Sequence, residues 1–377
     1  MNGQDLRKLY ESDGPQEFCG KMLALLREEK DKRKVKPEDF SLRELWEAVG
    51  RPAFGKMRQD LALLDERVLR EDALNTQAYS VITGELIAQK VIEGYDAVEA
   101  IGDQLVTVMP SKRRNENIPG FNALDMPVEV SESEDYPELD GLGEKYVTSQ
   151  ATKKGMIISV TEELVMEDQT GLLLQRAGMV GERIRLDREK TILTGVQDVN
   201  STVYKPSGSA SALYSSGHSN LVASNALADW TDLDKAYAAF RNLKDEVSEH
   251  VLQRWSQFKL LVPVSLGGTA HRIVSATEVR ATVGSNESVT TENRFRGLNP
   301  PLSSPYLDDQ STSTWYVGDF KRQFVWHEVW PLQTFRQRED SESRFVRDVV
   351  ARFKARYLGG IAAIDYKYVV KNISGAS

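Results

Sequence analysis

Carboxylate and imidazole side chains are the groups in this chain that could do chemistry, and their spacing decides which kind. The sequence has four histidines, and no two of them stand at the spacing that metal-ligand pairs use. An acidic segment could in principle hold calcium, but its order is not that of an EF-hand loop. Its carboxylates are Glu129, Glu132, Glu134, Asp135, Glu138 and Asp140. We therefore expect no metal site, no cofactor and no catalytic residue.

Nucleotide and nucleophile motifs point the same way. The sequence contains neither a Gly-x-Ser-x-Gly elbow nor a Walker phosphate loop. Gly141-Leu-Gly143 lacks the third glycine and the strand-to-helix setting of a dinucleotide site. His250 falls at the end of a predicted helix, where a cation favours the helix dipole. An α+β enzyme is a distant alternative, and its signature would be a buried carboxylate or histidine cluster in a pocket.

The composition is that of a folded chain with more than one domain. With 377 residues, 40% hydrophobic and 28% charged, a sizeable core and two or three domains are expected. A net charge of −8 argues against a dedicated nucleic-acid binder, though not against a protein that encloses nucleic acid. The single cysteine, Cys19, excludes an internal disulfide. We find no signal peptide and no apolar stretch long enough to span a bilayer.

The acidic segment lies in a predicted hairpin. No Lys or Arg occurs from residue 125 until Lys145, and Pro127 and Pro137 exclude a helix. The flanking stretches 126–130 and 145–160 favour extended structure, so we predict a long two-stranded hairpin with an acidic tip. An isolated hairpin is marginally stable unless something packs on it. We therefore expect the tip to reach a neighbouring molecule, with a solvated loop as the alternative.

A long amphipathic helix is predicted over residues 170–195. Leu173, Ala177, Val180 and Ile184 recur at three- and four-residue steps and form one apolar stripe. Thr170 suits the start of the helix, and Gly195 suits its end. At 1.5 Å per residue the helix would be roughly 36 Å long, enough to span a whole face of the molecule.

The remaining pattern mixes helices and strands. Helices are expected at 76–104, 229–252 and 270–276, with a short one beginning at a capping box over 159–162. Strands are expected at 105–108, 258–262, 314–317, 324–330, 349–358 and 365–371, and loops at 199–226 and 284–313. Residues 1–70 are dense in charge and helical, with too few apolar residues for a core of their own. Because the elements lack a βαβ rhythm, the predicted class is α+β.

The strand predicted at 349–358 alternates strictly. Val349, Ala351, Phe353, Ala355 and Tyr357 face one way. Arg352, Lys354 and Arg356 face the other way, and we call these three residues the basic ladder. The basic ladder is either a solvated face or a surface for an acidic partner.

In this order of elements the chain resembles the major capsid proteins of tailed bacteriophages. Four features carry the resemblance, which covers about residues 75–371. The first is the order of helical segment, long arm, acidic hairpin and long helix. The second is His218-Ser-Asn-Leu221 ahead of a helix. The third is the strand Leu260-Leu-Val-Pro263 after that helix. The fourth is the ending, with Arg352-x-Lys-x-Arg356, a Gly-Gly break and a last strand.

The resemblance implies the Hong-Kong-97-type capsid fold. Residues 71–118 would form an N-arm and 119–160 an extended hairpin, the E-loop. Residues 161–196 and 340–360 would form a peripheral domain with a long spine helix, and 197–339 and 361–377 an axial domain. Residues 1–70 would be a charged, scaffold-like segment and a possible assembly domain.

The same resemblance implies a function. The chain would form hexamers and pentamers of an icosahedral or prolate head that encloses double-stranded DNA without reading its sequence. Its partners would be further copies of itself, a portal, and scaffold or decoration proteins, with no membrane. It would be assembled in the host cytoplasm and reside in the virion.

Two further expectations follow from the resemblance. The acidic segment would contact the basic ladder of an adjacent subunit. Lys145, Lys153 and Lys154 lie where some members of the family form crosslinks, but no partner motif is visible, so no crosslink is expected. An encapsulin, a cellular compartment of the same fold, is the alternative, although encapsulins usually lack so long a charged N-terminal segment.

Overall fold

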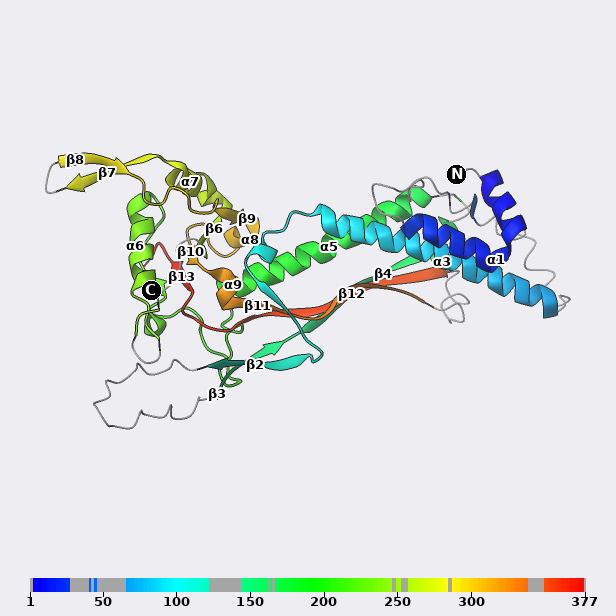
Figure 1. Cartoon of the computed structure of the whole chain (residues 1–377), viewed down its shortest axis with the longest axis horizontal. Helices are drawn as coiled ribbons and strands as arrows, with labels where there is room; N and C mark the ends of the chain where they lie inside the picture. Colours follow the sequence, from blue (N-terminus) through cyan, green and yellow to red (C-terminus); the bar gives the residue numbers. More distant parts are fainter. Residues whose placement is uncertain are drawn as a thin grey trace, which may run out of the picture. The chain divides into compact units, whose positions relative to one another are not determined.

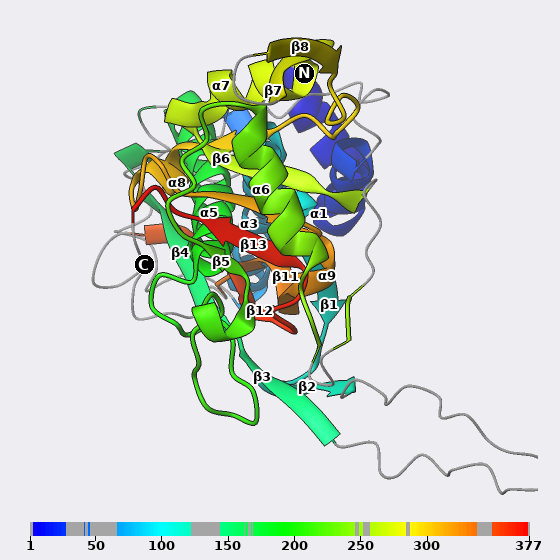
Figure 2. The ribbon, with the colours of Figure 1, turned by 90° about the vertical axis from the view of Figure 1, so that its left-hand side faces the viewer.

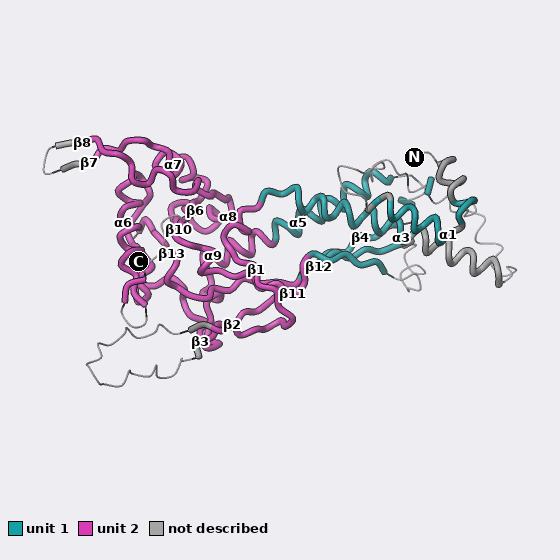
Figure 3. Tube along the Cα trace, viewed as in Figure 1, with its two compact units in different colours: residues 1–99, 153–187, 332–357 teal, residues 100–152, 188–331, 358–377 magenta. Residues whose placement is uncertain are grey.

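The computed structural model divides the chain into two compact units. It describes residues 3–27, 41, 44–45, 66–121, 144–161, 163–164, 167, 169–245, 249–251, 257–283, 287–337 and 349–375. Unit 1 comprises residues 1–99, 153–187 and 332–357, and unit 2 comprises 100–152, 188–331 and 358–377 (Figure 3). Each unit is thus assembled from three separate stretches of sequence.

Two N-terminal helices pack together in unit 1. Helix α1, Gly3–Arg27, lies alongside α3, Glu66–Ala97 (Figure 1). Phe18, Met22 and Leu26 of α1 are buried. The Gln89 side-chain amide of α3 donates a 2.7 Å hydrogen bond to the carbonyl of Leu26. Residues 3–27 are therefore helical, as predicted, and part of unit 1, while α3 begins ten residues before the expected position.

Helix α3 also crosses the long helix α5, Thr170–Gln197, at backbone contact distance. A Cβ atom placed on Gly94 would lie 2.2 Å from the carbonyl oxygen of Gly178. One placed on Gly181 would lie 2.0 Å from the carbonyl oxygen of Val91. Both distances are far below van der Waals contact, so the crossing requires glycine at these two positions.

The predicted stripe of α5 is confirmed, but its predicted end is wrong. Leu173, Ala177 and Ile184 are buried, and the helix begins at Thr170. It continues past Gly195, where a Cβ atom would lie 2.4 Å from the Ile361 side chain. Gly195 is therefore a close-contact residue inside the helix, and the chain leaves the helix at Asp198, which has a φ of +50°.

A four-stranded sheet has the order β1-β11-β12-β4. Its strands are β1 (Thr107–Pro110), β4 (Thr152–Thr161), β11 (Phe324–Arg336) and β12 (Val349–Ala363). β1 pairs in parallel with β11, which places Met109 opposite His327. β11 and β12 run beyond their predicted ends. β4 continues through Thr161, so the helix start expected from a capping box at 159–162 is wrong.

Unit 2 contains a five-stranded sheet of order β5-β13-β10-β6-β9. The strands are β5 (Leu221–Val222), β6 (Lys259–Pro263), β9 (Leu302–Ser304), β10 (Trp315–Gly318) and β13 (Val369–Asn372). Helices α6 (Trp230–Arg241) and α7 (Val264–Ser275) share a core with it, and α6 lies beside β13 (Figure 2). The strands contribute five buried side chains to this core: Leu260, Val262, Trp315, Val317 and Val370.

The smaller elements complete the description. They are the 3₁₀ turns Gly102–Gln104 and Ser216–His218, strands β2 (Asn115–Phe121), β3 (Glu144–Gln150), β7 (Glu278–Val283) and β8 (Glu287–Glu292), and short helices α8 (Pro305–Asp308) and α9 (Phe320–Gln323). β7 and β8 pair as an antiparallel hairpin.

Several predictions in unit 2 are wrong in extent. The helix expected at 270–276 begins at Val264, and the strand expected at 365–371 begins at Val369. The helix expected at 229–252 ends at Arg241, because the chain turns at Asn242 and Lys244 then pairs with His250 as an antiparallel bridge. His250 therefore does not end a helix. The loop expected at 284–313 contains β8, β9 and α8, and the pairing of these strands with partners elsewhere in the chain overrides the polar composition.

The α+β class is confirmed, since helices and strands alternate without a repeated parallel βαβ unit. Among the described helices, none is both long and apolar enough to cross a bilayer.

Candidate assembly surfaces

The basic ladder lies on β12 within unit 1, and its predicted alternation is confirmed. Ala351, Phe353, Ala355 and Tyr357 are all less than 7% exposed. On the opposite face, Lys354 is exposed and Arg352 and Arg356 are half-buried. The alternation follows from the two-residue period of a strand, which sends every second side chain into the unit.

An exposed aromatic ring lies under the cations of the basic ladder. The Arg356 guanidinium is 4.3 Å from the centroid of the Phe335 ring, and the Lys354 ammonium is 5.5 Å from it. Phe335, on β11, is 41% exposed. Cations over an aromatic face gain about 0.5–1 kcal/mol at exposed sites. The ring thus contacts two cations of the ladder, and it adds an apolar element to a positive surface.

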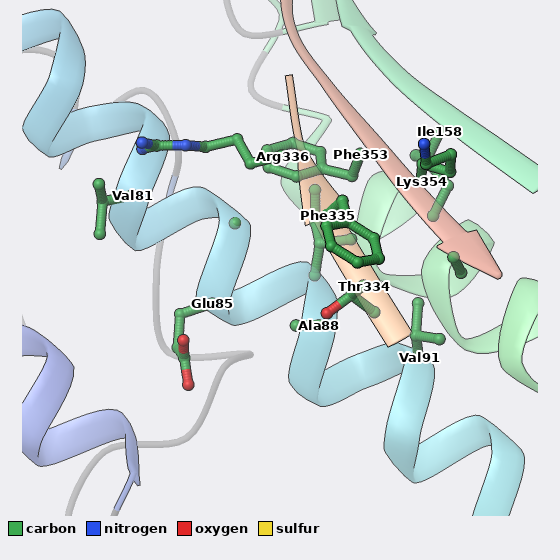
Figure 4. Close-up of a pocket in the computed structure, with 13 residues that line it drawn as sticks. Val81, Glu85, Ala88, Val91, Ile158, Thr334, Phe335, Arg336, Phe353 and Lys354 are labelled. Carbon is green, nitrogen blue, oxygen red and sulfur yellow. The ribbon is translucent and has the colours of Figure 1, made fainter. Parts of the chain in front are cut away.

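A small pocket lies between this sheet and α3, all within unit 1. Its volume is about 250 Å³, below the range of typical small-molecule sites. Most of the lining is apolar, with Glu85, Arg336 and Lys354 among it. Figure 4 shows α3 on one side of the pocket and Thr334, Phe335 and Arg336 on the other. The space fits one or two side chains rather than a substrate.

The acidic hairpin is described only at its base. β2 and β3 pair antiparallel from Asn115 opposite Gln150 to Phe121 opposite Glu144. The acidic residues Glu129, Glu132, Glu134, Asp135, Glu138 and Asp140, and the strand expected at 126–130, lie outside the described residues. The predicted return strand 145–160 is wrong as one strand, because the chain passes at buried Ala151 from β3 into β4, which belongs to another sheet.

At the base of the hairpin, in unit 2, a buried polar contact joins β2 and β3 to β11. The Ser149 hydroxyl lies 2.9 Å from Nδ1 of His327, and Oε2 of Glu116 lies 3.6 Å from Nε2 of the same ring. Ser149 and His327 are at most 1% exposed. Sequence reasoning missed this contact. Its signal was a serine between the apolar Val147 and Ala151, and a histidine directly after the apolar run Phe324-Val-Trp.

Unit 2 also holds a buried carboxylate, Asp198, near a small pocket. A buried carboxylate in such a place is what we would expect if the protein were an α+β enzyme. Burial raises the pKa of the Asp198 carboxyl, although backbone N–H groups, including that of Leu213 at 2.7 Å, donate to it. Burial likewise lowers the pKa of the Lys371 ammonium, which lies 5.9 Å from the centre of the Tyr316 ring. The donors that surround Asp198 are backbone groups of its own loop, so the carboxylate holds that loop in place.

Metal binding has no support in the described part of the chain. No three His, Cys, Asp or Glu side chains there gather at a distance that could hold an ion. Three of the four histidines instead have neighbours that give them structural roles. His218 stacks on Tyr366 at 4.0 Å, His250 lies in a backbone bridge and His327 contacts Ser149.

Comparison with known proteins decides between the remaining readings. A family model described as phage capsid protein matches residues 144–372, well over half of the chain. The chain belongs to the phage capsid protein family. The match spans β3, the long helix α5, the five-stranded sheet and the basic ladder. This capsid protein is therefore a structural subunit of a phage head shell, and the Hong-Kong-97-type fold agrees with the family.

Among solved structures, this capsid protein is similar to several capsids. The capsid of a native GTA particle is 12% identical with a TM-score of 0.49, covering 74% of this chain and 92% of that one. The protein of Gordonia phage Cozz is 12% identical with a TM-score of 0.47, covering 74% and 87%. That of Mycobacterium phage Bobi is 15% identical with a TM-score of 0.43, covering 74% and 92%. No curated protein matches the sequence.

Proposed function

We propose that this capsid protein forms hexamers and pentamers that close into an icosahedral or prolate head enclosing double-stranded DNA. The family match over residues 144–372 carries the proposal. The net charge of −8 suits a shell that surrounds DNA without gripping it, because phosphate binding needs clustered Lys and Arg. The role is structural rather than catalytic, and the encapsulin alternative gains nothing from the family match.

The contact that joins neighbouring subunits is proposed to pair the acidic segment of one copy with the basic ladder of the next. The exposed ammonium of Lys354 and the half-exposed Phe335 ring offer a cationic and apolar surface. The acidic segment, 129–140, supplies carboxylates with Tyr136 and Leu139 between them. Complementary charge sets register and partner choice more than affinity, as ring closure in a shell requires.

The finer layout is also part of the proposal. Residues 71–118 and 119–160 serve as N-arm and E-loop, and the peripheral and axial domains have the boundaries given by the resemblance. Residues 1–70 act as an assembly segment. A portal and scaffold or decoration proteins join the shell in the host cytoplasm. The support for this layout is the order of elements along a chain of this family.

Charge reversal tests the proposed contact. In the variant Glu132→Lys, Glu134→Lys, Asp135→Lys we expect a folded subunit with an unchanged circular dichroism spectrum and a severe loss of shells in negative-stain images. Adding Lys354→Glu to that variant should restore part of the assembly, because it provides one opposite charge and removes one like charge at the ladder. Normal shells from the triple variant would refute the proposed contact but would not contradict the proposed shell function.

A matched control separates this contact from net charge. Glu278, Glu292 and Asp309 are exposed acids in unit 2, outside the acidic segment. Reversing these three to Lys changes the net charge equally and should leave shell yield close to that of the wild type. Equal loss in both variants would show that overall charge, not the hairpin, controls assembly.

Particle content tests the shell function itself. Particles from phage-infected cells should contain double-stranded DNA, seen as nuclease-resistant ultraviolet absorbance that is released on disruption. A particle filled with an enzyme instead would support the encapsulin alternative. A full-length chain that yields only small discrete oligomers, with its scaffold partners supplied, would refute a shell.

A further inference from the structure

The buried polar contact at the base of the hairpin involves a registered pair of residues. Glu116 of β2 and Ser149 of β3 lie directly opposite each other in the antiparallel ladder. Both side chains meet the same imidazole, that of His327 on β11. One histidine therefore touches both strands of the hairpin at the same level.

The contact extends beyond the histidine on both sides. Nδ1 of His327 and the Ser149 hydroxyl are hydrogen-bonded at 2.9 Å, and Nε2 lies 3.6 Å from the Glu116 carboxylate. The Ser111 hydroxyl also donates to the Glu116 carboxylate. The result is a continuous chain of polar groups running from β3 through β11 to β2.

The order serine, histidine, carboxylate is that of a nucleophilic triad, but burial excludes that role. Ser149 is 1% exposed and His327 is fully buried, so no substrate could reach the hydroxyl. The distance of 3.6 Å between Oε2 of Glu116 and Nε2 of His327 is also longer than a hydrogen bond. The carboxylate therefore attracts the ring electrostatically rather than orienting it tightly.

The neighbours of Ser149 make the contact selective. Val147 of β3 and Ala151, which directly follows β3, are buried on the same side of the chain as Ser149, and both are apolar. A slip of β3 by two residues would keep the same face inward and place Val147 or Ala151, whose side chains form no hydrogen bond, at the position of Ser149. His327 would then lose its buried partner, and an unsatisfied buried polar group is costly. An apolar pair at these positions would pack in more than one register without such a penalty.

The other attachments of the hairpin do not discriminate in this way. The Thr148 N–H donates to the Lys205 carbonyl at 3.2 Å, and the Ser207 N–H donates to the Tyr146 carbonyl at 3.0 Å. Backbone groups that point to the same side recur at every second residue of a strand, so these bonds could re-form after a two-residue shift. Among the described polar contacts of β2 and β3 with β11, side-chain identity enters through His327 and its two partners.

We propose that Glu116, His327 and Ser149 form a polar lock that fixes the register of β2 and β3 against β11. The lock thereby fixes the backbone positions at which β2 ends, Phe121, and β3 begins, Glu144. The inference concerns the isolated subunit and does not depend on the proposed contact between subunits.

Hydrogen–deuterium exchange on the unassembled full-length subunit tests the lock. In Ser149→Ala we expect amides of 115–121 and 144–150 to exchange about tenfold faster or more, as for a locally opening segment. Amides of β6 and β10 should keep their wild-type rates. In ¹⁵N spectra of histidine-labelled protein, the Nδ1 signal of His327 should move in the same variant, while that of His218 stays.

Thr148→Val is the matched control, since it removes a hydroxyl one residue away that bonds to Asn117 across the hairpin rather than to His327. It should leave exchange at 115–121 and the His327 signal unchanged. The double variant Ser149→Ala, His327→Leu should keep the melting temperature within a few degrees yet exchange as fast as Ser149→Ala. Wild-type exchange rates in both Ser149 variants, or equal effects from Thr148→Val, would overturn the lock.

Discussion

Single buried acids in unit 2 act by holding backbone N–H groups, and their environments shift their pKa values in opposite directions. Asp232, in the first turn of α6, accepts from the N–H of Ala228 at 2.9 Å and of Asp229 at 3.2 Å. Burial alone would raise its pKa, but these donors and Lys235 outweigh burial and lower it. For Asp198, burial outweighs the donors and the pKa is raised.

Replacing Asp232 tests whether its carboxylate caps the N-terminus of α6. Asp232→Ala should lower the free energy of unfolding by about 1 kcal/mol at neutral pH, because two backbone donors lose their acceptor. The depressed folded-state pKa means that this contribution is present above the ordinary Asp pKa and is lost as pH falls through the folded value. Urea unfolding at several pH values measures it.

The control is Asp234→Ala on the same helix, where an ion pair with Arg294 at a partly exposed site is lost and no cap is affected. Its effect should be smaller than that of Asp232→Ala. A loss from Asp232→Ala that does not shrink in acid would contradict the assignment.

Asp198 should show the opposite pH dependence. Its raised folded-state pKa means that its contribution is full below the ordinary Asp pKa and is lost as pH rises through the folded value. Asp198→Asn keeps an acceptor for the Leu213 N–H and cannot ionise. Relative to that variant, the wild type should lose unfolding free energy as pH rises from about 3 toward neutrality. Parallel stability curves for the two proteins would refute the burial argument.

Between elements, close packing at glycine positions determines which helices can touch. Gly94 and Gly181 allow the backbones of α3 and α5 to meet, whereas Gly178, three residues from Gly181, has open space where a Cβ atom would be. The two glycines of α5 therefore have different roles on one helix.

The pair Gly181→Ala and Gly178→Ala tests that difference. Gly181→Ala should cost about 2–3 kcal/mol, because the methyl group overlaps the carbonyl of Val91 and the helices must separate. Gly178→Ala should stabilise by about 0.5–1 kcal/mol through helix propensity alone. Thermal and urea unfolding measure both. Equal effects of the two substitutions would mean that the crossing is not the cause.

Local patterns predicted elements well where the pattern and the packing agree. The alternation of β12 and the apolar stripe of α5 could be predicted because each element has one buried face. The end of the helix expected at 229–252 could not be predicted, because the apolar stripe continues through Leu243. The chain turns at Asn242, and Leu243 is buried outside the helix. Gly94 lies within a predicted helix, where glycine has low helix propensity, and its contact with α5 depends on residues far away in sequence.

Only part of the candidate surfaces could be predicted from the sequence. The basic ladder follows from strand periodicity, so its three residues could be named in advance. Phe335 and the polar lock could not, because they depend on pairings such as Ser149 with His327, residues separated by nearly half the chain. No spacing rule within one element predicts a contact of that kind.

Across the molecule, the proposed assembly depends on charge, and it should depend on salt. Raising ionic strength from 0.1 to 1 M shortens the screening length from about 10 to about 3 Å. Shell formation, followed by light scattering, should slow with added salt, and Lys354→Glu should slow it further at low salt. Lys190→Glu, which reverses an exposed cation of α5 outside the ladder, is the control and should behave as wild type. Salt-independent assembly would contradict an electrostatic contact.

The packing of α1 on α3 has a consequence for any shortened form of the chain. Phe18, Met22 and Leu26 are covered in the full-length protein, and Gln89 depends on the carbonyl of Leu26. A form beginning after residue 70 would carry the matching surface of α3 into water with an amide that has lost its acceptor. Such a form should bind apolar fluorescent dyes and aggregate, unless assembly supplies a new cover. Helix α1 thus shields the apolar surface of α3 from water.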